Sequence, residues 1–328
     1  MSPDVLQALQ HAERPAIIRG AVRDWPLVQK GLQSADAVMD YLSQFAGEHP
    51  LTQFSGPASM KGRFFYNEAR TGFNFEAKRV SVEAFFDAIK ASRNDPNAPH
   101  FYVGSTDLDR YFPGLRTEND LLASAGILQD QSVIASLWMG NRTTAAAHYD
   151  MSNNIACCLV GQRRFTLFPP DQIANLYPGP LEPTPAGQVV SMVDFDAPDF
   201  ETHPGFREAL ASAQVADLEP GDLLYYPALW WHQVEALDAF NVMVNYWWNE
   251  AEAFMDTPML TLMHGLLSLR DRTAQEKAAW KALFDYYVFG DSETPRVHLP
   301  DHMQGPLADL DAPEARRLRA ALLKRLNR

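Results

Sequence analysis

The sequence predicts a mainly β fold, a sandwich or barrel of jelly-roll type, preceded by an α/β region and followed by helices. Short segments rich in β-branched and aromatic residues follow one another between about residues 132 and 248, separated by Gly, Pro, Asn and Asp. Regular short strands of this kind are typical of jelly-roll folds. The chain has 328 residues, enough for one large domain with an accessory piece or for two ordinary domains. We expect an N-terminal α/β elaboration over 1–130 that packs on the barrel, a β core over 131–250 and a helical region over 251–328.

The N-terminal region mixes short helices with strands. Apolar residues at helical spacing predict helices over Asp4–Ala12 and Ser34–Phe45, and a further helix begins after Ser81, which is placed as its N-cap. The segments Pro15–Gly20 and His100–Gly104 have the composition of strands.

The β region is a series of predicted strands with one long interruption. The interruption is a Pro-rich insertion from Pro169 to about Ala213, and loops of that length are commonly lids or binding segments, with a plain surface insertion as the alternative. The predicted strands are Ser132–Met139, Ala145–Asp150, Asn154–Val160, Arg164–Phe168, Gln188–Met192, Gln214–Leu218, Leu223–Tyr226, His232–Ala236 and Asn241–Trp248.

The C-terminal region has helical periodicity. Helices are predicted over Met255–Leu269, Ala274–Phe289 and Ala312–Leu326, and the first two carry a broad apolar stripe. Such helices either cover the barrel or pair with a second subunit, and we expect a homodimer formed through them.

Composition narrows the classes of function. The net charge of −13 argues against broad binding to nucleic acid or to an anionic membrane, because phosphate contacts need clustered basic residues. No window approaches the roughly 18 to 20 apolar residues of a membrane helix. The N-terminus lacks the features of a secretory signal, so we expect a cytoplasmic protein. Cys157 and Cys158 lie side by side in an apolar run and are predicted to be small buried residues of a reduced protein.

A candidate metal site begins at His148-Tyr149-Asp150. Alternate residues of a strand share a face, so His148 and Asp150 can point the same way. His232 would supply a third ligand from a distant strand. Two imidazoles and one carboxylate on one side of a divalent metal are typical of non-haem Fe(II) oxygenases, whereas a hydrolytic zinc site or packed histidines are the alternatives.

Bulky aromatic residues surround His232 in the sequence. Most of this cluster is predicted to be barrel core, although such side chains also serve a metal site by excluding water. The cluster consists of Tyr225, Tyr226, Trp230 and Trp231.

Four separated motifs resemble one known family. The segments Gly140–Asp150, Arg163–Gln172, Val193–Asp196 and Pro220–His232 are similar to the Jumonji-C, cupin-like branch of the Fe(II)/2-oxoglutarate oxygenases. Within that branch they look most like the asparaginyl hydroxylase acting on hypoxia-inducible factor and its bacterial relatives. The resemblance is strong from about Phe101 to Trp248.

The resemblance implies a double-stranded β-helix in which His148, Asp150 and His232 bind Fe(II). It also implies a set of residues around the cosubstrate 2-oxoglutarate. A basic residue, lysine in the mammalian hydroxylase, anchors the distal carboxylate, and an arginine fork suits that role. In the family a threonine stands three residues before the first histidine. Here that position is Ala145, and the nearest hydroxyl groups belong to the two threonines just before it. The matching positions are Arg163 and Tyr102 for the distal carboxylate, Asn154 and Asn245 near the metal end, and Thr144, or Thr143 beside it, for the missing hydroxyl.

The implied activity is that of a dioxygenase, which couples oxidative decarboxylation of 2-oxoglutarate by O2 to hydroxylation of a C–H bond. Hydroxylation next to a methylated nitrogen amounts to demethylation. We expect a side chain of a protein or peptide as the substrate, with a small molecule as the alternative. A cupin-like protein that binds a metal or small ligand without turnover is the rival function.

Overall fold

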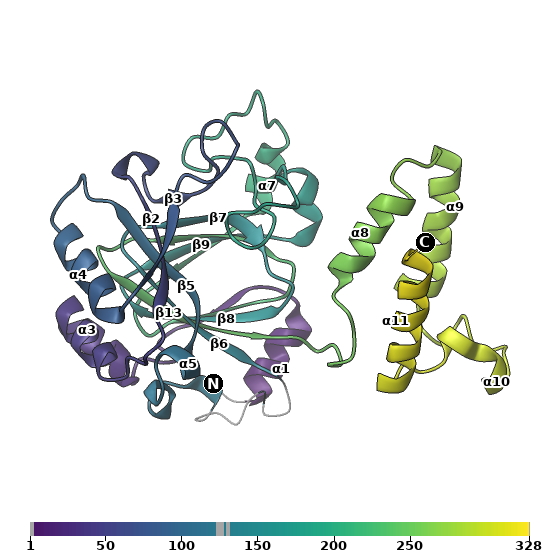
Figure 1. Cartoon of the computed structure of the whole chain (residues 1–328), viewed down its shortest axis with the longest axis horizontal. Helices are drawn as coiled ribbons and strands as arrows, with labels where there is room; N and C mark the ends of the chain where they lie inside the picture. The colour runs from purple at the N-terminus through teal and green to yellow at the C-terminus, as the bar shows by residue number, and fades with distance from the viewer. Residues whose placement is uncertain (1–2, 123–127, 129–131, 328) are drawn as a thin grey trace. The chain divides into compact units, whose positions relative to one another are not determined.

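The computed structural model of the protein describes residues 3–122, 128 and 132–327 (Figure 1). The predicted boundary between the N-terminal region and the β core, at residues 130 and 131, lies outside the described residues. The chain divides into two compact units, Met1–Asn249 and Glu250–Arg328.

Two β-sheets form the centre of the first unit, and the predicted mainly β, jelly-roll architecture is confirmed (Figure 1). The chain alternates between the sheets as it passes along β6 to β9, so each sheet supplies one wall of the interior. The larger sheet has the order β1 (Ala16–Ile18), β11 (Leu223–Tyr226), β8 (Asn153–Val160), β13 (Asn241–Trp248), β6 (Ile134–Gly140), β5 (His100–Asp107), β2 (Leu51–Gly56) and β4 (Glu76–Val80). The smaller sheet has the order β10 (Gln214–Leu218), β9 (Arg163–Phe168), β12 (Trp231–Ala236), β7 (Thr144–Tyr149) and β3 (Arg63–Phe64).

Helices cover the outer face of the larger sheet. The helix predictions hold, and the predicted N-cap forms, since Ser81 Oγ accepts from the Ala84 amide at 3.2 Å. Ser34 caps the helix that follows it in the same way and accepts from the Ala37 amide at 3.0 Å. The sequence did not predict α2, β2, β3 or β4. The helices of this region are α1 (Pro3–Ala12), α2 (Pro26–Gln33), α3 (Ala35–Ser43), α4 (Val82–Ser92) and α5 (Leu108–Tyr111), with short 3-10 turns η1 (Ala58–Met60) and η2 (Leu115–Thr117).

Strand β8 shows why a central strand carries a continuous run of apolar residues. Alternate residues of a strand face opposite sides, and both sides of β8 are covered. Cys157 packs with the helices, whereas Cys158 packs in the interior between the sheets. Both cysteines are buried and free, as predicted.

The predicted strand Gln188–Met192 is wrong. Only isolated bridges form there, between Val190 and His148 and between Ser191 and Pro178. The segment that bridges Ser191 contains Pro178 and Pro180, which cannot extend a ladder because proline has no amide hydrogen to donate. The insertion instead contains a 3-10 turn, η3 (Pro170–Ala174), and a helix, α7 (Phe206–Ser212).

The insertion packs on the barrel with an apolar cluster of its own. The cluster joins it to β9 and β12, so most of the insertion is fixed to the smaller sheet. Its buried members are Phe168, Leu176, Val189, Val193, Phe206, Ala209 and Trp231.

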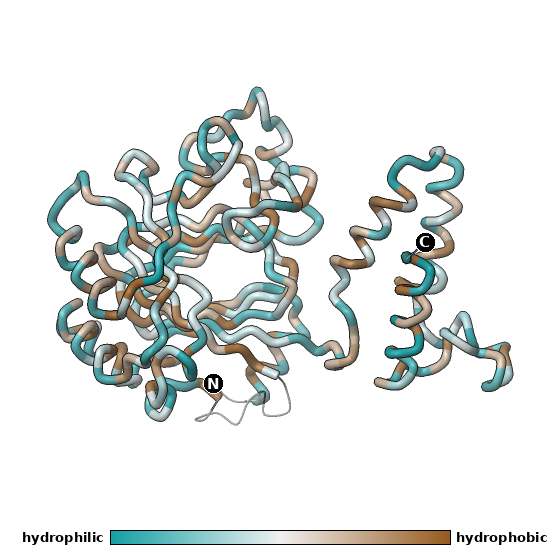
Figure 2. The backbone as a smooth tube through the Cα atoms, viewed as in Figure 1, coloured by the Kyte–Doolittle hydropathy of each residue, from teal (hydrophilic) through white to brown (hydrophobic). Residues whose placement is uncertain are grey.

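The second unit is helical, as predicted, and hydrophobic residues recur along its helices (Figure 2). Many of its apolar side chains are exposed. Its elements are α8 (Pro258–Ser268), α9 (Ala274–Phe284), a π-helical turn η4 (Asp285–Phe289), α10 (Asp301–Gln304), η5 (Gly305–Leu307) and α11 (Ala312–Leu326). Within it, Arg319 of α11 pairs with Asp256 at 2.8 Å. In the described part of the chain, no helix has both the length and the apolar character needed to cross a membrane.

Candidate active site

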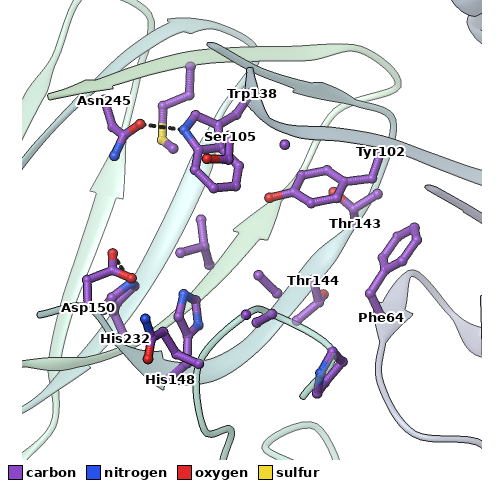
Figure 3. A pocket seen from close by; sticks show the side chains of 18 of the residues that line it. Phe64, Tyr102, Ser105, Trp138, Thr143, Thr144, His148, Asp150, His232 and Asn245 are labelled. Carbon is purple, nitrogen blue, oxygen red and sulfur yellow. Dashed lines mark hydrogen bonds and ion pairs between the residues drawn. The ribbon is translucent and has the colours of Figure 1, made fainter. Parts of the chain in front are cut away.

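The three residues of the predicted metal site lie together at one end of a cavity between the sheets (Figure 3). Strands β7 and β12 are antiparallel neighbours, and their register pairs His148 directly with His232. The two imidazole rings have centroids 4.4 Å apart. Asp150 follows the end of β7, with Oδ2 3.6 Å from Nε2 of His232. One ligand atom from each of the three residues lies within 4.8 Å of the others.

Backbone carbonyls fix the orientation of both histidines. Nδ1 of His148 lies 2.8 Å from the carbonyl oxygen of Ala146, and Nδ1 of His232 lies 2.9 Å from that of Trp230. An Nδ1–H that donates to a carbonyl leaves Nε2 as a lone-pair donor, the arrangement found behind metal-binding histidines. Burial, with the neighbouring His148, lowers the pKa of His232 to about 4. The ring is therefore neutral at physiological pH, the form that binds metals.

A chain of hydrogen bonds holds Asp150. Its Oδ2 accepts from Trp247 Nε1 at 3.1 Å and from Asn154 Nδ2 at 3.3 Å. Asn245 Nδ2 lies 3.5 Å from Asn154 Oδ1, and Trp138 Nε1 donates to Asn245 Oδ1 at 2.5 Å. Of the two asparagines predicted near the metal end, Asn154 therefore contacts the carboxylate, and Asn245 contacts Asn154. The sequence reasoning missed both tryptophans, although Trp247 lies two residues from Asn245 on the same strand face.

Arg163 is a buried cation in the same cavity. It begins β9, is 4% exposed, and has a pKa lowered by burial. Its Nε has no hydrogen-bond partner, and no described carboxylate forms an ion pair with it. Arg164, the next residue, is exposed and pairs with Asp217 at 2.7 Å. Because an unpaired buried guanidinium is costly, this site fits a ligand that brings its own carboxylate.

The cavity has a volume of about 390 Å³. Tyr102, Thr143 and Thr144 line it, so both candidate hydroxyls reach it, and burial raises the pKa of Tyr102. Residues 185–188 of the insertion form part of the wall, so the insertion is more than a surface loop. Aromatic side chains form much of the remaining wall: Phe54, Phe64, Phe75, Trp138 and Trp247.

The aromatic cluster around His232 divides between two roles. Tyr225, Trp230 and Trp231 are buried in packing clusters, as expected for barrel core. Tyr226 also belongs to the interior cluster, but it lines the cavity beside His232.

Replacing Trp247 with phenylalanine is expected to weaken binding of a divalent metal about 10- to 100-fold, because the substitution keeps the ring and removes the hydrogen bond to Asp150. Trp248→Phe is the matched control, since the buried Nε1 of Trp248 donates to none of the described residues. Titration of each variant with Co(II), followed by its d–d absorption, checks this. Equal affinities of the two variants would show that the hydrogen bond does not position the ligand.

Comparison with known proteins agrees with this fold. The profile of the cupin-like domain family matches residues 3–254. The chain therefore belongs to the JmjC, cupin-like family, which confirms the family that its motifs resemble.

Three relatives show the range of this family. Lysine-specific demethylase JMJ31 of Arabidopsis thaliana is 26% identical over 263 residues, covering 71% of this chain and 46% of the relative. JmjC domain-containing protein D of Dictyostelium discoideum is 27% identical over 239 residues, covering 68% and 49%. tRNA wybutosine-synthesizing protein 4 of Gibberella zeae is 25% identical over 242 residues, covering 71% and 22%. The chain thus spans about half the length of these relatives or less.

Proposed function

We propose that the protein is an Fe(II)- and 2-oxoglutarate-dependent dioxygenase that hydroxylates a side chain of a protein or peptide, or demethylates it through hydroxylation. The observation that carries this proposal is the buried guanidinium of Arg163, without a carboxylate partner among the described residues, in the cavity that also holds the His-Asp-His group. A dicarboxylate that chelates a metal at one end and meets Arg163 at the other satisfies both features.

The metal and the cosubstrate would be held by separate groups of residues, with Asn154 and Asn245 near the metal end. Nε2 of His148, Nε2 of His232 and the carboxylate of Asp150 would hold Fe(II) on one face and leave the opposite face open. Arg163 and Tyr102 would bind the distal carboxylate, and Thr144 would add a hydroxyl. When bound, the ferrous ion with 2-oxoglutarate and O2 supplies the oxidising power for C–H hydroxylation. The aromatic walls keep bulk water away from this chemistry.

Two rival functions make different demands on the same residues. A hydrolytic zinc site would use the three ligands but would give Arg163 and Tyr102 no role. A binding protein without turnover would use all of them, so only an assay separates it from an oxygenase.

A protein or peptide substrate is supported by two observations. Relatives of this chain include proteins named lysine-specific demethylases, from Arabidopsis thaliana and Xenopus tropicalis. Another relative is named for tRNA modification, but the net charge of −13 disfavours a polyanionic substrate. A cytoplasmic location stays a prediction.

Release of succinate tests the proposed activity. Purified protein incubated with Fe(II), ascorbate, 2-oxoglutarate and candidate peptides should release succinate and add one oxygen atom, or remove one methyl group, per peptide turned over. Asp150→Ala protein is the control and should release none. Absence of succinate from fully reduced, iron-loaded protein would favour the binding protein, and turnover with free metabolites alone would contradict the peptide substrate.

We also propose that the second unit pairs two copies of the chain. Apolar side chains of α8, η4 and α11 are exposed in the described structure, including Leu267 at 80%, Phe289 at 76% and Leu322 at 46%. Contiguous exposed apolar patches often mark sites of protein interaction.

Light scattering after gel filtration is expected to give the mass of a dimer for the full chain. The double variant L322E/L326E should give a monomer, because two carboxylates would be buried at the interface. Arg316→Glu, a charge change at an exposed position of the same helix, should stay dimeric. A monomeric mass for the unmodified chain would refute this proposal.

A further inference from the structure

Tyr226 points into the cavity although its sequence context predicts barrel core. It ends β11 and is paired with Asn154 of β8. Successive residues of β11 alternate in direction, so Tyr225 packs toward the helices, whereas Leu224 and Tyr226 pack between the sheets. The register therefore puts the ring of Tyr226 beside the residues of the metal site.

The hydroxyl of Tyr226 lacks a hydrogen-bond partner among the residues that the structure describes, although the side chain is buried. The ring centroid lies 4.7 Å from that of His232 and 6.1 Å from that of Phe165, and Tyr226 lines the cavity. Buried tyrosine hydroxyls normally find a partner. Tyr246 follows that rule, since its hydroxyl bonds to Asp120 at 3.1 Å and accepts from the Leu121 amide at 3.1 Å. The hydroxyl of Tyr226 is thus a donor whose partner has to come from the cavity.

The surroundings place this donor at the metal end. The ring of Tyr226 lies against the ring of His232, and β11 pairs Tyr226 with Asn154, whose side chain donates to Asp150. Figure 3 shows Tyr102 across the cavity from Asp150 and His232. A phenol is protonated at neutral pH and can donate only one hydrogen bond.

We propose that Tyr226 is a cosubstrate-binding residue whose hydroxyl donates to the metal-chelating carboxylate of 2-oxoglutarate. This inference rests on the proposed function. A carboxylate oxygen is the acceptor that gains most from a neutral donor in a largely apolar cavity, because the hydrogen bond is charge-assisted. The metal and Arg163 already bring positive charge, so a neutral donor adds binding without further repulsion. With Tyr226, each end of the dicarboxylate has its own phenol.

Two ligands of Co(II)-loaded protein distinguish contacts at the metal end of the cavity from contacts at the Arg163 end. Oxalate chelates a metal but has no distal arm, whereas N-oxalylglycine has both ends of 2-oxoglutarate. Titration followed by Co(II) absorption should show that Tyr226→Phe weakens both ligands by a similar factor of about 10, as expected for a hydrogen bond to a charged group. Arg163→Met should weaken N-oxalylglycine and leave oxalate unchanged. Tyr149→Phe is the control, because Tyr149 packs on Trp231 outside the cavity.

The outcomes distinguish this inference from the proposed function. Unchanged oxalate affinity in Tyr226→Phe would overturn the role of Tyr226 while N-oxalylglycine binding by the unmodified protein still supports the oxygenase. Loss of N-oxalylglycine affinity alone would place Tyr226 at the distal end and would also overturn it. Failure of the unmodified protein to bind Co(II) or either ligand would contradict the proposed function itself. Tyr226→Met serves as a second variant, with circular dichroism to confirm that each is folded.

Discussion

Replacing His232 with alanine is expected to lower the affinity for Fe(II) by at least about 100-fold and to abolish turnover of 2-oxoglutarate. Loss of a residue that hydrogen-bonds to a metal ligand typically lowers metal affinity 10- to 100-fold, so loss of a ligand itself should lower it further. His232 is 2% exposed and is paired with His148, so no other described side chain can take its place without moving the strands. Mn(II) binding followed by electron paramagnetic resonance measures this directly.

The control for that experiment is His264→Ala. His264 lies on exposed helix α8, outside the candidate site, and its loss should leave metal affinity unchanged. Equal affinity of the His232 variant and the unmodified protein would show that the metal binds elsewhere.

Arg163→Met is expected to raise the KM for 2-oxoglutarate by about 100-fold and to stabilise the ligand-free protein. Truncating one partner of a buried charge pair costs roughly 2–5 kcal/mol of binding, which corresponds to about 30-fold or more. In the ligand-free protein the same guanidinium is buried and forms no ion pair with a carboxylate of the described residues. Methionine has a similar length and no charge, so the substitution should raise Tm. The two opposite changes form a signature that simple misfolding cannot produce.

Arg164→Met is the matched control. Arg164 is the next residue of β9, but its side chain is exposed and pairs with exposed Asp217. Its loss should therefore change the free energy of unfolding by about 0–1 kcal/mol and leave KM unchanged. Arg163→Lys should retain part of the affinity, because an ammonium supplies the charge without the bidentate fork. An unchanged KM in Arg163→Met would remove the main support for a dicarboxylate cosubstrate.

Local patterns were sufficient to predict much of the barrel. The strands β10, β11 and β13 have the predicted limits, and the turn residues Pro220-Gly221-Asp222 mark the boundary between β10 and β11. The pair His148 and Asp150 could be predicted to share a face from the two-residue period alone. Placing His232 opposite them needed the resemblance, since no local rule determines which distant strands become neighbours.

The remaining features depend on packing between distant segments. An aromatic residue on a strand has the same sequence signature whether it fills the core, like Trp231, or lines the cavity, like Tyr226 and Trp247. The segment Gln188–Met192 has the composition of a strand, but it forms only single bridges beside β7. Strands β2 and β4 form one edge of the larger sheet, where β2 pairs with β5, and composition does not reveal this pairing.

A crystal structure of the protein with Mn(II) and N-oxalylglycine tests the central claim most directly. We predict one metal ion bound by Nε2 of His148, Nε2 of His232 and the carboxylate of Asp150, with the free carboxylate of the ligand paired to the guanidinium of Arg163. A metal bound by other residues, or a ligand whose carboxylate does not meet Arg163, would contradict the account.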